Sequence, residues 1–204
     1  MVLLKPLLKR LPKGRSVRRL GLAFCLAFCL AGGLPPGWAA AAEPPADLAA
    51  EIKAALLFNF AKFVEWPAEA FPDLSAPMTF CVYGEDSVGA GLEALIRGET
   101  LSGRRLAVRR LRDLQQVREC HLLFVSAAEK GRVSETLAAL RDARVLTVGE
   151  GADFLGRGGM IRLFLEQNRM RFDINLDAAE KSGLKISSKL LRLAQAVNPQ
   201  RRGG

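Results

Sequence analysis

Few residues of this chain have the types and spacing that catalysis or metal binding requires. His121 is the only histidine, and it directly follows Cys120 in an apolar stretch. One histidine with dispersed cysteines and acidic residues does not give the ligand spacing of a zinc site. A serine–histidine–aspartate triad would have to use His121, and the sequence contains no G-x-S-x-G motif. We therefore expect no metal, no cofactor and no enzymatic activity.

The first 42 residues have the composition of an export signal. Residues 1–19 hold seven lysines and arginines and no acidic residue, residues 20–31 are apolar, and three alanines end at Ala42. This order is typical of a cleaved signal peptide. The apolar run is too short to cross a bilayer, which takes roughly 20 residues. The expected mature protein is exported and is not inserted in the membrane after cleavage.

Removal of the signal peptide changes the charge of the chain. Its seven basic residues account for most of the formal net charge of +9, so the mature chain is close to neutral, at about +2. The charge is therefore poor evidence for nucleic-acid binding, and we expect none. Residues 43–46 read as a short leader, residues 47–198 as a single domain, and residues 199–204 as a flexible basic tail.

Two cysteines, Cys81 and Cys120, remain after cleavage of the signal peptide. Cysteines of an exported protein meet an oxidising compartment and are usually paired. Cys81 lies in the first predicted strand and Cys120 at the head of the third, and neighbouring strands can bring Cα atoms within the roughly 7 Å that a disulfide needs. We expect a Cys81–Cys120 disulfide, with two free buried thiols as the alternative.

The pattern of the body predicts an α/β fold. Residues 52–66 read as a mostly apolar helix that Pro67 ends. Apolar strands then alternate with helical segments, which favours a mainly parallel sheet of five to six strands with helices on both faces. Residues 160–165 and 170–176 read as a C-terminal β-hairpin, because two alternating runs flank a short polar turn.

One candidate site lies at the carboxyl ends of the predicted strands. Ligands of open α/β sheets bind in a crevice at this end. The residues that would line it are Gly84, Glu85, Asp86, Gly149 and Asp153. The alternative is that the glycines only form tight turns between strands and helices, since no phosphate-binding glycine motif is matched.

A second candidate site is a partner-binding surface around the hairpin. Arginine and aromatic residues are enriched at protein interfaces. The candidates are Arg162, Arg169, Arg171 and Asn175, with Trp66 at the end of the first predicted helix. The alternative is that the arginines form solvated polar faces of an edge pair and that the helix is an ordinary core helix.

Two long motifs carry a resemblance to a known family. The sequence KAALLFNFAKFVEWP (53–67) resembles the N-terminal signature of the YfiR family of periplasmic proteins. The sequence from Gly158 to Ala194, GGMIRLFLEQNRMRFDINLDAAEKSGLKISSKLLRLA, is similar to the other end of the same family. The resemblance also implies a disulfide of this placement. Some members have a second cysteine pair toward the C-terminus, which this chain lacks, so redox control through that pair is not carried over.

The resemblance implies a function that composition and periodicity do not reveal. YfiR-like proteins bind the periplasmic sensor domain of an inner-membrane diguanylate cyclase and repress it, which lowers cyclic-di-GMP signalling and biofilm formation. We expect such a repressor here, with a homodimer left open. The alternative hypothesis is a periplasmic small-molecule binding protein that uses the crevice at the strand ends.

Overall fold

The computed structural model describes residues 46–84 and 87–198, which belong to one compact unit. The predicted signal peptide (1–42), the predicted tail (199–204), Glu85 and Asp86 lie outside the described residues, as does the predicted leader apart from Ala46. Ala46 already begins the first helix. No helix in the described part of the chain combines the length and apolar character needed to cross a membrane.

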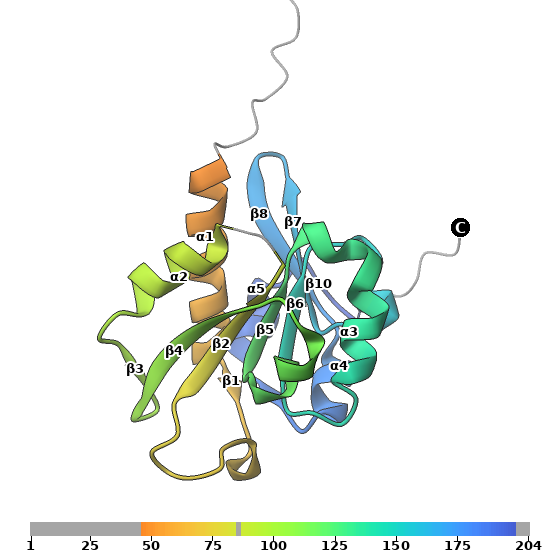
Figure 1. The fold of residues 1–204 in the computed structure, drawn as a ribbon. Helices are drawn as coiled ribbons and strands as arrows, with labels where there is room; N and C mark the ends of the chain where they lie inside the picture. The colour runs from red at the N-terminus through yellow and green to blue at the C-terminus, as the bar shows by residue number, and fades with distance from the viewer. Residues whose placement is uncertain (1–45, 85–86, 199–204) are drawn as a thin grey trace, which may run out of the picture. The chain divides into compact units, whose positions relative to one another are not determined.

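The predicted α/β class is confirmed, with a mostly parallel sheet as its centre (Figure 1). Within the described residues this sheet has eight strands in the order β10-β8-β7-β6-β5-β2-β4-β3. Only the β3–β4 and β7–β8 pairs of this sheet are antiparallel. The strands are β2 (Met78–Tyr83), β3 (Thr100–Leu101), β4 (Arg104–Leu111), β5 (Leu122–Val125), β6 (Leu146–Gly149), β7 (Ile161–Glu166), β8 (Arg169–Ile174) and β10 (Ala196–Val197).

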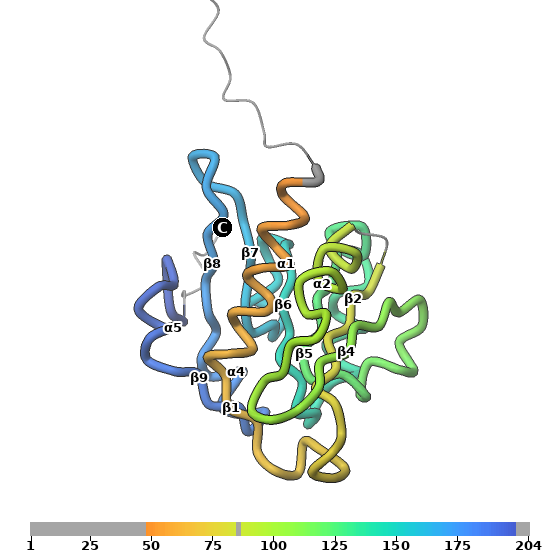
Figure 2. The backbone as a smooth tube through the Cα atoms, turned by 90° about the vertical axis from the view of Figure 1, so that its left-hand side faces the viewer, coloured from red at the N-terminus to blue at the C-terminus, as the bar shows by residue number. Residues whose placement is uncertain are grey.

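Helices cover both faces of this sheet, as Figures 1 and 2 show from two directions. Helices α1 and α2 pack with the strands into one apolar cluster, and α3 packs into a second cluster on the opposite face. The helices are α1 (Ala46–Lys62), α2 (Val88–Ile96), α3 (Val133–Ala139), α4 (Leu176–Lys181) and α5 (Ser188–Leu193), with 3₁₀ helices η1 (Ala68–Ala70), η2 (Leu114–Glu119), η3 (Ala127–Arg132) and η4 (Leu155–Arg157).

The central strands are buried because their side chains are apolar on both faces. In β2, Phe80 and Val82 belong to the cluster with α1 and α2, whereas Cys81 and Tyr83 belong to the cluster with α3. Successive residues of a strand point to opposite faces, so one continuous apolar run supplies both clusters. Strand β5 divides in the same way and is buried along its whole length.

Helix α1 ends earlier than the position of Pro67 predicts. The helix stops at Lys62, and Val64–Glu65 forms the short strand β1. This strand pairs antiparallel with β9 (Lys185–Ile186), and the carbonyl oxygen of Phe63 accepts a 2.8 Å hydrogen bond from Ser187 N. A partner more than 120 residues away along the chain thus ends the helix four residues before Trp66.

The sheet has eight strands in the described residues, against the five to six predicted. The strands β3 and β10, which lie at the two edges of the sheet, were not predicted. Each is only two residues long, and a strand this short shows no pattern of alternation in the sequence. The predicted hairpin is present, with a shorter turn than expected. Gln167 and Asn168 alone form it, both with positive φ, as a type I′ turn requires.

Two glycines, Gly149 at the end of β6 and Gly159 before β7, make room for an aromatic ring. A Cβ atom on Gly149 would lie 2.5 Å from the Phe154 ring, and one on Gly159 would lie 2.2 Å from it. Phe154 itself is fully buried. These glycines are therefore required by close packing of the chain against its own side chain.

This packing predicts the effect of a single added methyl group. Gly149→Ala should lower the free energy of unfolding by about 1–3 kcal/mol, because the Phe154 ring has to move within a close-packed core. Gly131→Ala is the matched control, since nothing lies within 4 Å of its added Cβ. Urea unfolding of both variants measures the difference, and equal stabilities would contradict the packing argument.

Candidate functional site

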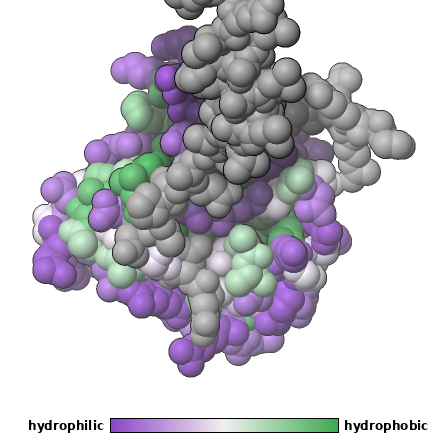
Figure 3. Space-filling model, turned by 90° about the horizontal axis from the view of Figure 1, so that it is seen from above, coloured by the Kyte–Doolittle hydropathy of each residue, from purple (hydrophilic) through white to green (hydrophobic). Residues whose placement is uncertain are grey.

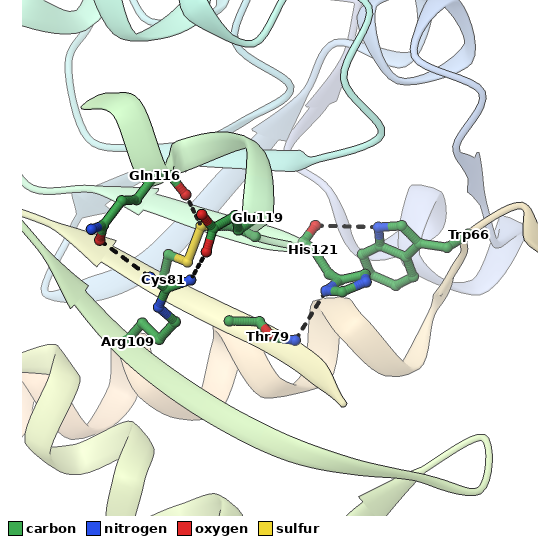
Figure 4. Close-up of a disulfide and its surroundings, with 8 residues drawn as sticks. Trp66, Thr79, Cys81, Arg109, Gln116, Glu119 and His121 are labelled. Atoms are coloured by element: carbon green, nitrogen blue, oxygen red, sulfur yellow. Dashed lines mark hydrogen bonds and ion pairs between the residues drawn. A yellow bond between two sulfur atoms is a disulfide. The ribbon is translucent and has the colours of Figure 1, made fainter. Parts of the chain in front are cut away.

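The predicted disulfide joins Cys81 of β2 to Cys120, the residue that ends η2 (Figure 4). The two Cα atoms lie 5.8 Å apart, and both cysteines are buried. Arg109 of β4, opposite Cys81 in the sheet, pairs with Glu119 and donates a 3.2 Å hydrogen bond to Gln116. The disulfide thus lies inside the sheet–η2 junction, and solvent reductants reach it only when that junction opens.

Hydrogen bonds of His121 link the amino end of β5 to the connection that follows α1 (Figure 4). Thr79 N donates a 3.0 Å hydrogen bond to His121 Nδ1, so Nδ1 is an acceptor and the proton lies on Nε2. His121 Nε2 then donates to the carbonyl oxygen of Ala70, 3.2 Å away. The fold therefore holds His121 as one neutral tautomer, with both ring nitrogens engaged by main-chain groups.

Aromatic stacking completes this junction. The Phe71 ring stacks on His121 with centroids 4.3 Å apart, and the Arg104 guanidinium lies 3.7 Å above Phe71. Arg104 also donates hydrogen bonds to the carbonyl oxygens of Asp73, Leu74 and Ala76. Burial, opposed by the hydrogen bond to Ala70 and assisted by the Arg104 charge, lowers the pKa of His121 below its usual 6.5.

The predicted crevice residues do not gather around one opening. The space beside Gly149 is filled by Phe154, and a Cβ on Gly84 would lie 2.6 Å from Glu129 Cγ. Asp153 pairs with Arg157 one helical turn later. Glu85 and Asp86 lie outside the described residues.

A small cavity does lie at this end of the sheet. It has a volume of about 80 Å³. Its lining comes from the ends of β5 and β6 and from η3 and α3: Val125, Ser126, Ala127, Lys130, Val133, Glu150, Gly151 and Phe154. None of the predicted crevice residues in the described part of the chain lines it.

Glu150 was not foreseen from the sequence, and it connects this end of the sheet to α1. Its Oε1 lies 2.8 Å from Lys53 Nζ in a pair that is mostly buried. Its Oε2 is buried and has no hydrogen-bond partner in the described part of the chain. A lysine within a mostly apolar helix was the sequence signal for such a pair, because a buried ammonium group needs a counter-charge.

Arg162 is part of the interior of the hairpin region and does not lie free on its surface. Its guanidinium lies 2.6 Å from the carboxylate of Asp173, directly opposite on β8, and Asp173 is only 4% exposed. Arg162 also donates a 3.2 Å hydrogen bond to Ala152 O and lies over the Phe164 ring at 4.5 Å. These contacts tie β7, β8 and the loop after β6 together.

Asn175 and Trp66 likewise make structural contacts. Asn175 caps α4, since its side-chain oxygen accepts a 3.1 Å hydrogen bond from Ala178 N. The indole N–H of Trp66 donates a 3.2 Å hydrogen bond to His121 O at the amino end of β5. The hairpin tip lies beyond the carboxyl end of β6, because β7 runs parallel to β6 and continues past it. Trp66 and the tip are therefore at opposite ends of the sheet.

Arg169 and Arg171 are the predicted partner-binding residues that remain accessible. Arg169 is exposed, and the Arg171 side chain is 40% exposed with its Nε 4.0 Å from Glu166. Seen from the end at which the hairpin projects, the described surface is mostly hydrophilic with small apolar patches (Figure 3). The residues of the described part form no group of three or more histidine, cysteine, aspartate or glutamate side chains that could hold a metal ion.

These features define an α/β domain stabilised by a buried disulfide, with a projecting basic hairpin at one end of its sheet. The sequence profile of the YfiR/HmsC-like family matches residues 50–195. This chain belongs to that family, as its two motifs predicted.

Two solved structures also resemble the fold. One is a conserved domain protein from Vibrio cholerae, with 13% identity and a TM-score of 0.48. The other is an ABC domain in complex with L-Trp from Streptococcus pneumonia, with 10% identity and the same TM-score. Each alignment covers 72% of this chain and 60% of the other chain. This chain thus spans less than two thirds of the length of either structure.

Removal of the disulfide should destabilise the protein strongly. The bond closes a loop with a sequence separation of 39 residues, and loss of a native disulfide from an exported domain typically costs about 2–5 kcal/mol. The double variant Cys81→Ser/Cys120→Ser avoids a leftover free thiol and should show this loss in urea unfolding. Reductant should destabilise the wild-type protein and leave the double variant unchanged. If the urea midpoint of the wild-type protein is the same with and without reductant, the disulfide does not stabilise the fold.

The lowered pKa of His121 predicts that the protein loses stability in acid. Because its folded-state pKa is lowered, the unfolded chain binds the proton more readily, so stability falls as the pH drops below the unfolded value of about 6.5. Protonation would also direct an N–H at Nδ1 toward the N–H of Thr79. We expect wild type to lose more stability between pH 7.5 and pH 5 than His121→Gln, whose side chain does not titrate. Parallel losses in the two proteins would contradict the assignment.

Proposed function

We propose that this protein is an exported, non-catalytic regulator that binds the periplasmic domain of an inner-membrane diguanylate cyclase and represses it. Repression lowers cyclic-di-GMP signalling and biofilm formation. In this proposal residues 1–42 are a cleaved signal peptide, the described residues form the single periplasmic domain, and residues 199–204 are a basic tail. Membership of the YfiR/HmsC-like family over residues 50–195 is the observation that carries the proposal.

The arrangement of the domain supports a binding role. A repressor of this kind acts by having a higher affinity for the inactive state of its receptor than for the active state. The disulfide and the His121 junction stabilise the amino end of the sheet. The hairpin at the carboxyl end presents Arg169 and Arg171 to solvent. We place the partner-binding surface at this hairpin, and Arg162, Asn175 and Trp66 support the fold around it.

The cavity beside Glu150 favours one alternative function. Its volume of about 80 Å³ and its mainly apolar lining suit a small apolar ligand or group. In that case the protein would be a periplasmic small-molecule binding protein. A ligand that stays bound through purification and is lost in Gly151→Leu would support this alternative.

The repressor proposal predicts the result of a gene deletion. Cellular cyclic-di-GMP should rise when the gene is removed and return to its original level when the gene is supplied again. Arg169→Glu should raise cyclic-di-GMP toward the deletion level, because a reversed charge at an interface typically weakens binding about tenfold or more. Cyclic-di-GMP is measured by mass spectrometry of cell extracts at equal protein abundance.

Arg105→Glu is the matched control, since Arg105 is also exposed and lies on β4 near the other edge of the sheet. It changes the net charge by the same amount and should leave repression intact. Arg162→Glu is unsuitable for this purpose, because it would place two carboxylates together at Asp173 and destabilise the fold. If the deletion leaves cyclic-di-GMP unchanged, the repressor proposal is wrong.

A further inference from the structure

The outer edge of β8 is only partly covered. Strand β10 pairs with β8 at Asp173 and Ile174 alone, so the half of β8 nearer the turn has β7 on one side and no described strand on the other. Figures 1 and 2 both show the β7–β8 hairpin rising beyond the neighbouring strands. An open strand edge of this kind presents main-chain hydrogen-bonding groups to solvent.

The register shows which main-chain groups are open. The carbonyl oxygens of Phe172 and Ile174 accept hydrogen bonds from Gln195 N and Asn198 N, so these two residues direct their main-chain groups away from β7. Alternation along the strand gives Met170 the same direction. No described residue forms a hydrogen bond with the N–H or C=O of Met170 on this side.

Side chains give the open edge two different faces. Leu163 and Phe172 lie on the face that packs against α1, and Met170 packs against the same cluster. Arg169 and Arg171 lie on the opposite face of the hairpin. A strand added beside Met170 would therefore place alternate side chains next to an apolar face and next to a basic face.

We propose that the open edge of β8 at Met170 is the docking site for a β-strand of the partner, in which acidic and apolar side chains alternate. The inference rests on the proposed function, since it gives the mode by which a regulated receptor binds. Main-chain hydrogen bonds to Met170 hold the added strand, as in other complexes formed by strand addition. Carboxylates beside Arg169 and Arg171 set its register and its charge preference.

The arginines also decide against a second copy of this chain as the occupant. Two β8 strands paired antiparallel about Met170 would place Arg169 of each protomer opposite Arg171 of its partner. Like charges directly opposite each other destabilise a strand pair. A strand of opposite charge meets no such repulsion.

The direct test uses an eight-residue peptide in which glutamate and valine alternate, added to the ¹⁵N-labelled mature protein at up to about 1 mM, the range expected for one short strand. We expect the largest amide shifts, and slowed amide exchange, at Met170 and Phe172. A peptide of the same composition with paired glutamates and paired valines, and one with lysine in place of glutamate, should bind at least about tenfold more weakly.

Variants separate the strand edge from the charge. Met170→Pro removes the outward N–H and should abolish binding, whereas Met170→Ala keeps that N–H and should retain most of it. Arg169→Glu leaves the main chain intact and reverses one charge beside the docking site, so it should weaken binding of the glutamate peptide. This variant tests the proposal if Met170→Pro fails to fold. The proposal is overturned if the peptide does not bind, if it binds Met170→Pro as well as wild type, or if its shifts lie away from β8.

A dimer of the free protein that is lost in Met170→Pro would also overturn the proposal, because a second copy would then be the occupant. These results are independent of the gene deletion. Peptide binding without a cyclic-di-GMP change would refute only the repressor function. A cyclic-di-GMP change without peptide binding would refute only the docking mode.

Discussion

The burial of the central strands on both faces is the constraint on which the rest of the structure depends. Strand β5 is buried throughout, and β2 divides its side chains between two apolar clusters. A parallel sheet of this kind is stable only when helices remove both faces from water. This requirement places α1 and α2 on one face and α3 on the other.

The hairpin marks where this double burial stops. Strands β7 and β8 keep the apolar face toward α1, but their other face carries Arg162, Arg171 and Asp173. A carboxylate buried as deeply as that of Asp173 is costly without a counter-charge, and Arg162 supplies one. Polar character in this half of the sheet is thus partly structural, and only the exposed arginines near the turn are available to a partner.

The two ends of the sheet have different physical roles. At the amino end, the disulfide and the neutral His121 join the connection after α1 to β2 and β5. At the carboxyl end, an incompletely covered strand edge lies beside exposed arginines. An open strand edge leaves main-chain N–H and C=O groups available for pairing with another strand.

The sequence by itself determined the fold class, the main strands, the disulfide and the family. Each depends on a signal that can be read directly in the sequence: apolar runs, turn residues, two cysteines and two long motifs. The roles of single polar residues were decided only by tertiary structure. Arg162, Asn175 and Trp66 looked alike as surface candidates, yet each contacts a residue that another element brings near.

The end of α1 at Lys62 was also decided by tertiary structure, since pairing with β9 overrides the local preference for helix. Contacts between residues distant in the sequence leave no periodic pattern, and they decided which arginines remain exposed.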